Sequence, residues 1–124
     1  MKYLTSVRQI EQREAEPRRQ AFRDEFTACW LCKRPAVDIH EMTPGAGRRR
    51  GFQERATWIR TCRLCHATSL QPFLVPYSLA GQLALKALRD PEWYDRELVL
   101  AIRGKAPTAV TEPEVVSAAL SLAI

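Results

Sequence analysis

The chain has 124 residues, of which 46% are apolar, and a formal net charge of +5. This length and composition suit one domain with a modest core and argue against a disordered chain. No apolar run is long enough to span a bilayer, and the charged N-terminus lacks an apolar signal core. We therefore expect a cytoplasmic protein without a membrane partner, in a reducing compartment where paired cysteines bind metal before they form disulfides.

Residues 1–28 predict an N-terminal helical arm. Apolar residues recur on one side of a helix over residues 3–15, and Pro17 then interrupts this pattern. Because proline suits the first position of a helix, we expect a second helix to begin there. Phe22 and Phe26 lie four residues apart on that helix and share one face.

Residues 29–70 predict a small core of two strands and a helix. Alternating apolar and polar residues over 36–42 predict a first strand, and residues 56–62 predict a second. A helix is expected to begin within residues 65–71. Between the strands, residues 43–53 are predicted to form a loop, because they contain one proline and three glycines.

Residues 71–124 predict helices that pack on this core. The first covers residues 78–90, with Ser78 as its N-cap, and the second begins at a proline and covers residues 91–104. A last short helix is expected within residues 111–124. We expect the three segments of the chain to form one compact domain.

All four cysteines of the chain fall in two C-x2-C pairs that are separated by 29 residues. Two residues between thiolates let a tight turn aim both sulfurs at one tetrahedral ion, and two such pairs complete a four-sulfur site. We expect a structural Zn2+, because such a site leaves no open position for a substrate. The alternative is four unrelated buried or redox-active cysteines. The expected ligands are Cys29, Cys32, Cys62 and Cys65.

Both histidines of the chain lie close to these cysteines in sequence. His40 falls in the first predicted strand, and His66 directly follows the last cysteine. Closing the zinc site would bring that strand and the following helix together, so the two histidines could face one another across a small site. The alternative is that His66 caps or packs beside the zinc and that His40 is an ordinary strand residue.

The positive charge is concentrated around the cysteines, because residues 29–70 have eight basic and three acidic side chains. A local excess of this kind indicates a polyanionic partner, most simply nucleic acid. Arginine pairs with phosphate through two hydrogen bonds, and glycine lets a backbone approach closely. The alternative is a solvated basic loop. The expected nucleic-acid-binding residues are Arg48, Arg49, Arg50, Arg55, Arg60 and Arg63.

The pattern CWLC…DIHEM…CRLCH resembles the HNH endonucleases, in the subgroup whose ββα-metal core is braced by a four-cysteine zinc site. It is similar to small members of that family from phages and prophages. The resemblance covers residues 29–70. It implies an α+β fold with a zinc-stapled ββα-metal core, flanked by N-terminal helices and a C-terminal helical segment.

The resemblance also implies roles for individual residues. In the family, two adjacent residues on the first strand bind a divalent cation and act as the general base. His40 takes the ligand position, and Glu41 takes the base position. His66 matches the final histidine, which is the second ligand of a cation such as Mg2+, Mn2+ or Ni2+. Asp38 shares a strand face with His40 and is an extra ligand or an orienting group.

Two positions depart from the family pattern. Glu41 stands where histidine is usual, and the middle asparagine of the family falls near Thr57. Glutamate is mostly ionised at neutral pH and is a weaker base than histidine, and the loss of a matched base costs about 10²–10⁴ in rate. We therefore predict a weakened metal-dependent DNA endonuclease. The alternatives are a non-catalytic zinc-finger module that binds nucleic acid or protein, and a zinc-stapled domain whose helices form an interaction surface.

Overall fold

A computed structural model of the chain describes residues 6–68 and 78–122. The start of the first predicted helix, at residue 3, lies outside the described residues. The same holds for the end of the helix predicted within 65–71 and for the last two residues of the chain. None of the described helices combines the length and the apolar content needed to cross a bilayer.

The N-terminal arm is one helix, α1 (Val7–Glu25), and not the two helices that Pro17 led us to expect. It begins at Ser6, whose hydroxyl accepts from the backbone N–H of Gln9 while the Gln9 side chain accepts from the backbone N–H of Ser6. This reciprocal capping satisfies two backbone donors at the helix start. Pro17 lies on the exposed side of α1, so its ring is tolerated without disturbing the buried side.

The two predicted strands are present and form an antiparallel hairpin. β1 (Asp38–Glu41) pairs with β2 (Trp58–Thr61), so that Asp38 lies opposite Thr61 and Glu41 lies opposite Trp58. Side chains alternate between the two faces of a strand. Asp38 and His40 therefore share one face of β1, and Ile39 and Glu41 share the other.

The predicted loop between the strands contains short helical turns. These are η1 (Gly45–Gly47), α2 (Arg48–Gly51) and, after the loop, η2 (Arg55–Thr57). Gly51 is required here, because a Cβ on it would collide with the Thr43 hydroxyl. Its carbonyl accepts from the Thr57 hydroxyl and from the Trp58 indole, both at 2.8 Å. These contacts hold the arginine-rich turn against β2.

The C-terminal segment is helical, as predicted, but it is divided differently. Ahead of this segment, α3 (Arg63–Thr68) begins directly after Cys62 and contains Cys65. Within the segment, α4 (Leu79–Arg89) begins at the predicted cap Ser78, whose hydroxyl accepts from the Gly81 backbone N–H. The helix expected over 91–104 is instead a 3-10 turn, η3 (Pro91–Trp93), followed by α5 (Arg96–Ile102). The last helix is α6 (Glu112–Leu122).

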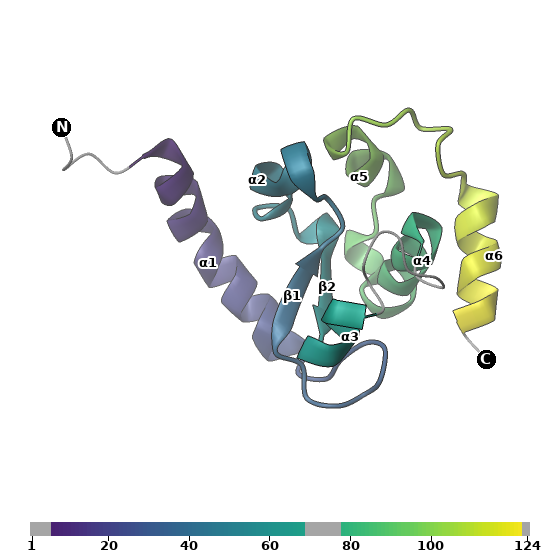
Figure 1. Ribbon diagram of the computed structural model, residues 1–124, viewed down its shortest axis with the longest axis horizontal. Helices are drawn as coiled ribbons and strands as arrows, with labels where there is room; N and C mark the ends of the chain where they lie inside the picture. The colour runs from purple at the N-terminus through teal and green to yellow at the C-terminus, as the bar shows by residue number, and fades with distance from the viewer. Residues whose placement is uncertain (1–5, 69–77, 123–124) are drawn as a thin grey trace.

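These elements surround the hairpin. Figure 1 shows β1 and β2 in the middle, with α1 on one side and α4, α5 and α6 on the other. The core joins both sides, because Phe22 of α1 packs edge-on against Trp30 and Trp58, and Leu83 of α4 is equally buried. The fold is a mostly helical α+β arrangement around a two-stranded hairpin. The buried residues of the core cluster are Phe22, Trp30, Ile39, Met42, Trp58, Ile59, Leu83, Ala84, Leu85, Val99 and Val115.

Candidate metal centre and histidine pocket

The four cysteines converge on one point. Their sulfur atoms all lie within 4.8 Å of one another, and the Sγ atoms of Cys32 and Cys62 are 3.6 Å apart. Four sulfurs bonded to one tetrahedral zinc at about 2.3 Å lie about 3.8 Å from each other, so the cluster fits a structural Zn2+. The four side chains are free thiols rather than disulfides. The predicted cluster is therefore confirmed, with the ligand set Cys29, Cys32, Cys62 and Cys65.

Tight backbone turns aim these sulfurs. In the first pair, the Cys29 N–H donates to the Arg34 carbonyl at 2.7 Å, and the Lys33 N–H donates to the Cys29 carbonyl at 3.0 Å. Lys33 adopts a left-handed conformation (φ 69°), which closes the turn. In the second pair, the Cys65 N–H donates to Cys62 Sγ at 3.4 Å and lowers the pKa of the Cys62 thiol. This bond favours the thiolate, which is the form that binds metal.

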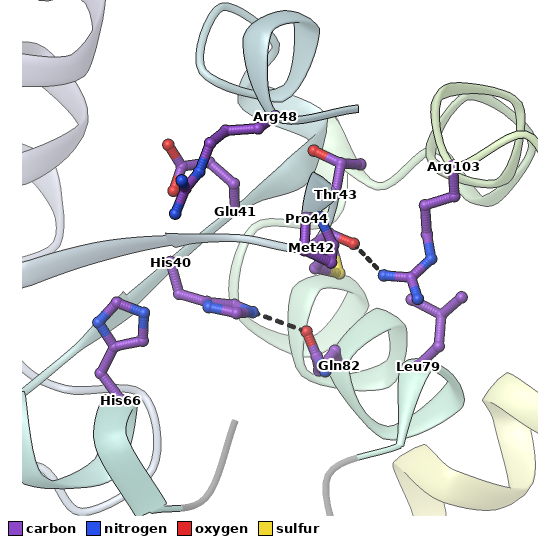
Figure 2. A pocket seen from close by; sticks show the side chains of 10 residues that line it. All are labelled: His40, Glu41, Met42, Thr43, Pro44, Arg48, His66, Leu79, Gln82 and Arg103. Atoms are coloured by element: carbon purple, nitrogen blue, oxygen red, sulfur yellow. Dashed lines mark hydrogen bonds between the residues drawn. The ribbon is translucent and has the colours of Figure 1, made fainter. Parts of the chain in front are cut away.

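The two histidines lie beside the cluster and face each other. β1 positions His40 and α3 positions His66, and their ring centroids are 5.1 Å apart with the planes at 76° (Figure 2). His66 is held close to the cysteines because its backbone N–H donates to the Cys62 carbonyl. The structure thus brings together the two residues that the sequence singled out.

Each imidazole is held through one nitrogen. His66 Nδ1 lies 3.2 Å from the Asp38 carboxylate, and His40 Nε2 lies 2.9 Å from the Gln82 amide oxygen. Both oxygens are acceptors, so these ring nitrogens are the donors, and in the neutral form of each ring the other nitrogen, His66 Nε2 or His40 Nδ1, has a lone pair. Asp38 thus has the geometry of an orienting group for His66. His40, His66 and Asp38 do not form a second convergent metal group in the part of the chain that the structure describes.

The histidines open into a cavity of about 270 Å³, which we call the histidine pocket. Burial lowers the pKa of His40 to about 4, so its imidazole is neutral at pH 7. Arg103, at the end of α5, also reaches this pocket and donates to the Met42 carbonyl. The lining residues are His40, Glu41, Met42, Thr43, Pro44, Arg48, His66, Leu79, Gln82 and Arg103.

Glu41 lines the histidine pocket but emerges from the opposite face of β1. Its carboxylate accepts from the buried guanidinium of Arg19, 3.3 Å away. Thr57, near the position of the missing asparagine, donates its hydroxyl to the carbonyls of Gly51 and Glu54. Thr57 therefore fixes the loop between the strands and does not contact either histidine through this hydroxyl.

The six arginines that were expected to bind nucleic acid have different surroundings. Arg60 is only 4% exposed and donates to the backbone carbonyls of three residues, and Arg55 binds Asp90 and Glu25. The guanidinium groups of Arg55 and Arg60 are thus engaged inside the protein, and their binding to phosphate stays a prediction. The other four, in α2 and α3, are exposed: Arg48, Arg49, Arg50 and Arg63.

Sequence reasoning did not identify Gln82 and Arg103 as parts of this site. Both belong to the C-terminal helices, where no motif or spacing distinguishes them from ordinary surface or packing residues. Their side chains reach the pocket because α4 and α5 pack beside the hairpin, and the sequence alone does not show this packing.

Comparisons of the chain with protein-family models, with curated proteins and with solved structures find no match.

Proposed function

We propose that the protein is a metal-dependent DNA endonuclease of the HNH type. The observation that carries this proposal is the contact between His40 and His66 in a pocket beside a four-cysteine cluster. Each ring is held through one nitrogen, by Asp38 or by Gln82, and retains the other. Proteins commonly orient metal-binding histidines in this way, with a carboxylate or carbonyl oxygen behind the ring.

In this proposal, His40 Nδ1 and His66 Nε2 bind one divalent cation such as Mg2+, Mn2+ or Ni2+. Bound there, the cation would offset negative charge on the scissile phosphate. Glu41 lines the same pocket and would accept the proton of the attacking water. Arg103 reaches the pocket from the end of α5 and would bind phosphate oxygens there (Figure 2).

Exposed arginines lie on two of the helices that contribute residues to this pocket, α2 and α3. Arg48 and Arg50 project from α2, and the Arg63 side chain is 77% exposed at the start of α3. Arginines at such positions bind the phosphate backbone and contribute affinity with little sequence specificity. We therefore expect the protein to bind DNA, with an affinity that depends little on the DNA sequence.

A nicking assay on supercoiled plasmid tests the proposal. Wild-type protein with Mg2+, Mn2+ or Ni2+ is expected to produce open circles, and His40→Ala is expected to abolish this product. Glu41→Gln should slow cleavage by about 10²–10⁴, because it removes the proton acceptor. The matched control is Glu14→Gln, an exposed carboxylate on α1 outside the pocket. Equal nicking by wild type and His40→Ala would assign the activity to another site or to a contaminant.

A non-catalytic zinc module that binds nucleic acid is the second candidate. The ion pair between Glu41 and Arg19 favours it, because Arg19 holds the carboxylate on the face of β1 away from His40. Under this alternative, calorimetry would find no divalent cation bound beyond the zinc. The protein would then bind DNA tightly and leave plasmid uncut with every cation tested.

A further inference from the structure

A second cavity, of about 300 Å³, lies between α1 and α2, and we call it the α1–α2 cavity. Glu41 and Arg48 line both this cavity and the histidine pocket, so the two spaces adjoin. Its volume is at the lower end of the range of ligand pockets, roughly 300–1,000 Å³. The lining residues are Arg8, Glu11, Gln12, Glu41, Arg48, Arg49, Phe52 and Gln53.

The charges around this cavity leave an excess of two cations. Glu11 forms an ion pair with Arg49, and Glu41 forms one with Arg19, so both acidic groups of the lining are neutralised. Arg8 and Arg48 have no ion pair or hydrogen bond to another side chain within residues 6–68 and 78–122. Two unpaired guanidinium groups at one cavity favour a ligand with a phosphate group.

The cavity also has one aromatic wall. Phe52 lies at the end of α2, and the guanidinium carbon of Arg19 is 3.8 Å from the centre of its ring. Arg19 is 5% exposed and donates to the Phe52 carbonyl, so it fixes this ring in position. An aromatic ring next to unpaired arginines is the combination on which proteins stack the bases of single strands.

We propose that the α1–α2 cavity is a subsite for one unpaired nucleotide of a DNA strand. Arg8 and Arg48 bind the phosphate of this nucleotide, and its base stacks on Phe52. Base pairing and stacking inside a duplex would keep the base out of the cavity, so the subsite selects single-stranded or distorted DNA. The proposal rests on the proposed function only in placing the cut phosphate in the adjoining histidine pocket.

Binding measurements test the subsite separately from cleavage. Fluorescence anisotropy with the zinc-loaded chain and no added divalent cation would compare a short labelled single strand with the duplex of the same sequence. Arg8→Ala should weaken single-strand binding and reduce the slope of log K against log salt by about 0.7. The matched control is Arg13→Ala, which removes the same charge from an exposed position of α1 outside the cavity.

Phe52→Leu tests the stacking wall while keeping an apolar side chain next to Arg19. It should weaken single-strand binding about tenfold and duplex binding much less. The subsite would be overturned if Arg8→Ala matched Arg13→Ala, or if Phe52→Leu left the preference for single strands unchanged. If the wild type nicks plasmid while these variants bind normally, the subsite is wrong and the nuclease stands. If the variants lose single-strand binding but the wild type never cleaves, the subsite stands and the nuclease is wrong.

Discussion

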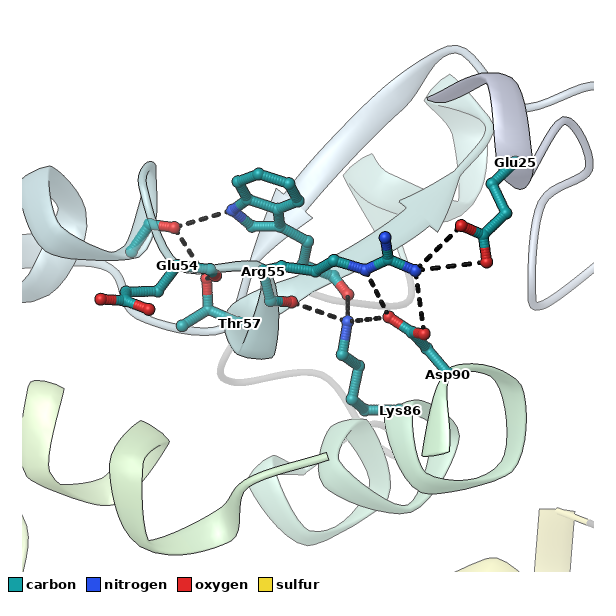
Figure 3. A network of polar contacts seen from close by, with 8 residues as sticks. Glu25, Glu54, Arg55, Thr57, Lys86 and Asp90 are labelled. Carbon is teal, nitrogen blue, oxygen red and sulfur yellow. Dashed lines mark hydrogen bonds and ion pairs between the residues drawn. The ribbon is translucent and has the colours of Figure 1, made fainter. Parts of the chain in front are cut away.

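The ammonium group of Lys86 lies in the core, where it is surrounded by hydrogen-bond acceptors. Its side chain is fully buried, and Nζ donates to the carbonyls of Arg55 and Trp58 and to the Asp90 carboxylate (Figure 3). Asp90 also accepts two hydrogen bonds from Arg55. Burial lowers the pKa of Lys86 to about 8 even beside this carboxylate. The charged lysine therefore depends on Asp90.

Asp90→Asn should be strongly destabilising. It removes the negative charge that Lys86 and Arg55 share and leaves a buried ammonium without compensation, which costs about 3 kcal/mol. Chemical denaturation at pH 7 would measure the free energy of unfolding. Glu92→Gln, an exposed change two residues away, is the control and should alter it by less than about 0.5 kcal/mol. An equal, small effect of both changes would mean that solvent reaches the network.

Single residues also show how far the site could be predicted. The spacing of the cysteines predicted the metal cluster, and the positions of His40 and His66 beside the cysteines predicted their contact. Gln82 and Arg103 lie 42 and 61 residues from their hydrogen-bond partners in the pocket. Contacts over such separations depend on how α4 and α5 pack, which local patterns do not encode.

Among the elements, α1 gives the clearest difference between local propensity and packing. A proline inside a helix lacks a backbone N–H and clashes with the preceding turn, which is why two helices were predicted. The helix nevertheless continues for 19 residues, because Ala15, Arg19 and Phe22 are buried along one side of it. Tertiary contacts on both sides of Pro17 offset the local cost.

Pro17→Ala should therefore stabilise the protein. The exposed position accepts alanine, and the restored hydrogen bond and relieved clash should add about 2 kcal/mol to the free energy of unfolding. Thermal and chemical denaturation would measure the gain. Glu14→Ala changes another exposed position of α1 to the same residue and should have little effect. A loss of stability in Pro17→Ala would show that the proline ring makes a contact the helix needs.

The other elements differ in how well local sequence patterns predicted them. Alternation of apolar and polar residues predicted the first strand, and residues 56–62 predicted the second, in which all four residues of β2 are buried. The helical turn α2 was missed because the three glycines in residues 43–53 indicate a loop, although Gly51 is there for close packing against Thr43. α5 begins later than predicted, because the Asp95 carboxylate caps it by accepting from the Leu98 N–H. This side-chain cap sets the start of α5 after Asp95, although Pro91 indicated an earlier start.

At the scale of the whole molecule, the cysteine cluster ties together distant parts of the chain. The first pair follows α1, and the second pair joins β2 to α3. The Trp30 N–H donates to the Arg60 carbonyl, and the Arg60 guanidinium donates to Phe26, Ala36 and Asp38, so hydrogen bonds reinforce the same junction. The histidine pocket lies directly beside it, so its geometry depends on the junction remaining closed.

Zinc removal should therefore affect the fold as a whole. The purified chain is expected to contain one Zn2+, and Cys62→Ser should remove it. Zinc binding contributes about 10–16 kcal/mol to the folding of small zinc-binding peptides, which is comparable to the total stability of a domain. We expect Cys62→Ser, or the wild type with excess chelator, to lose its cooperative melting transition and the near-ultraviolet circular dichroism of its buried tryptophans, Trp30 and Trp58. Arg34→Ala, an exposed change in the first turn, is the control and should keep both zinc and melting transition. Elemental analysis without stoichiometric zinc, or mass spectrometry showing disulfides among the four cysteines, would contradict the prediction.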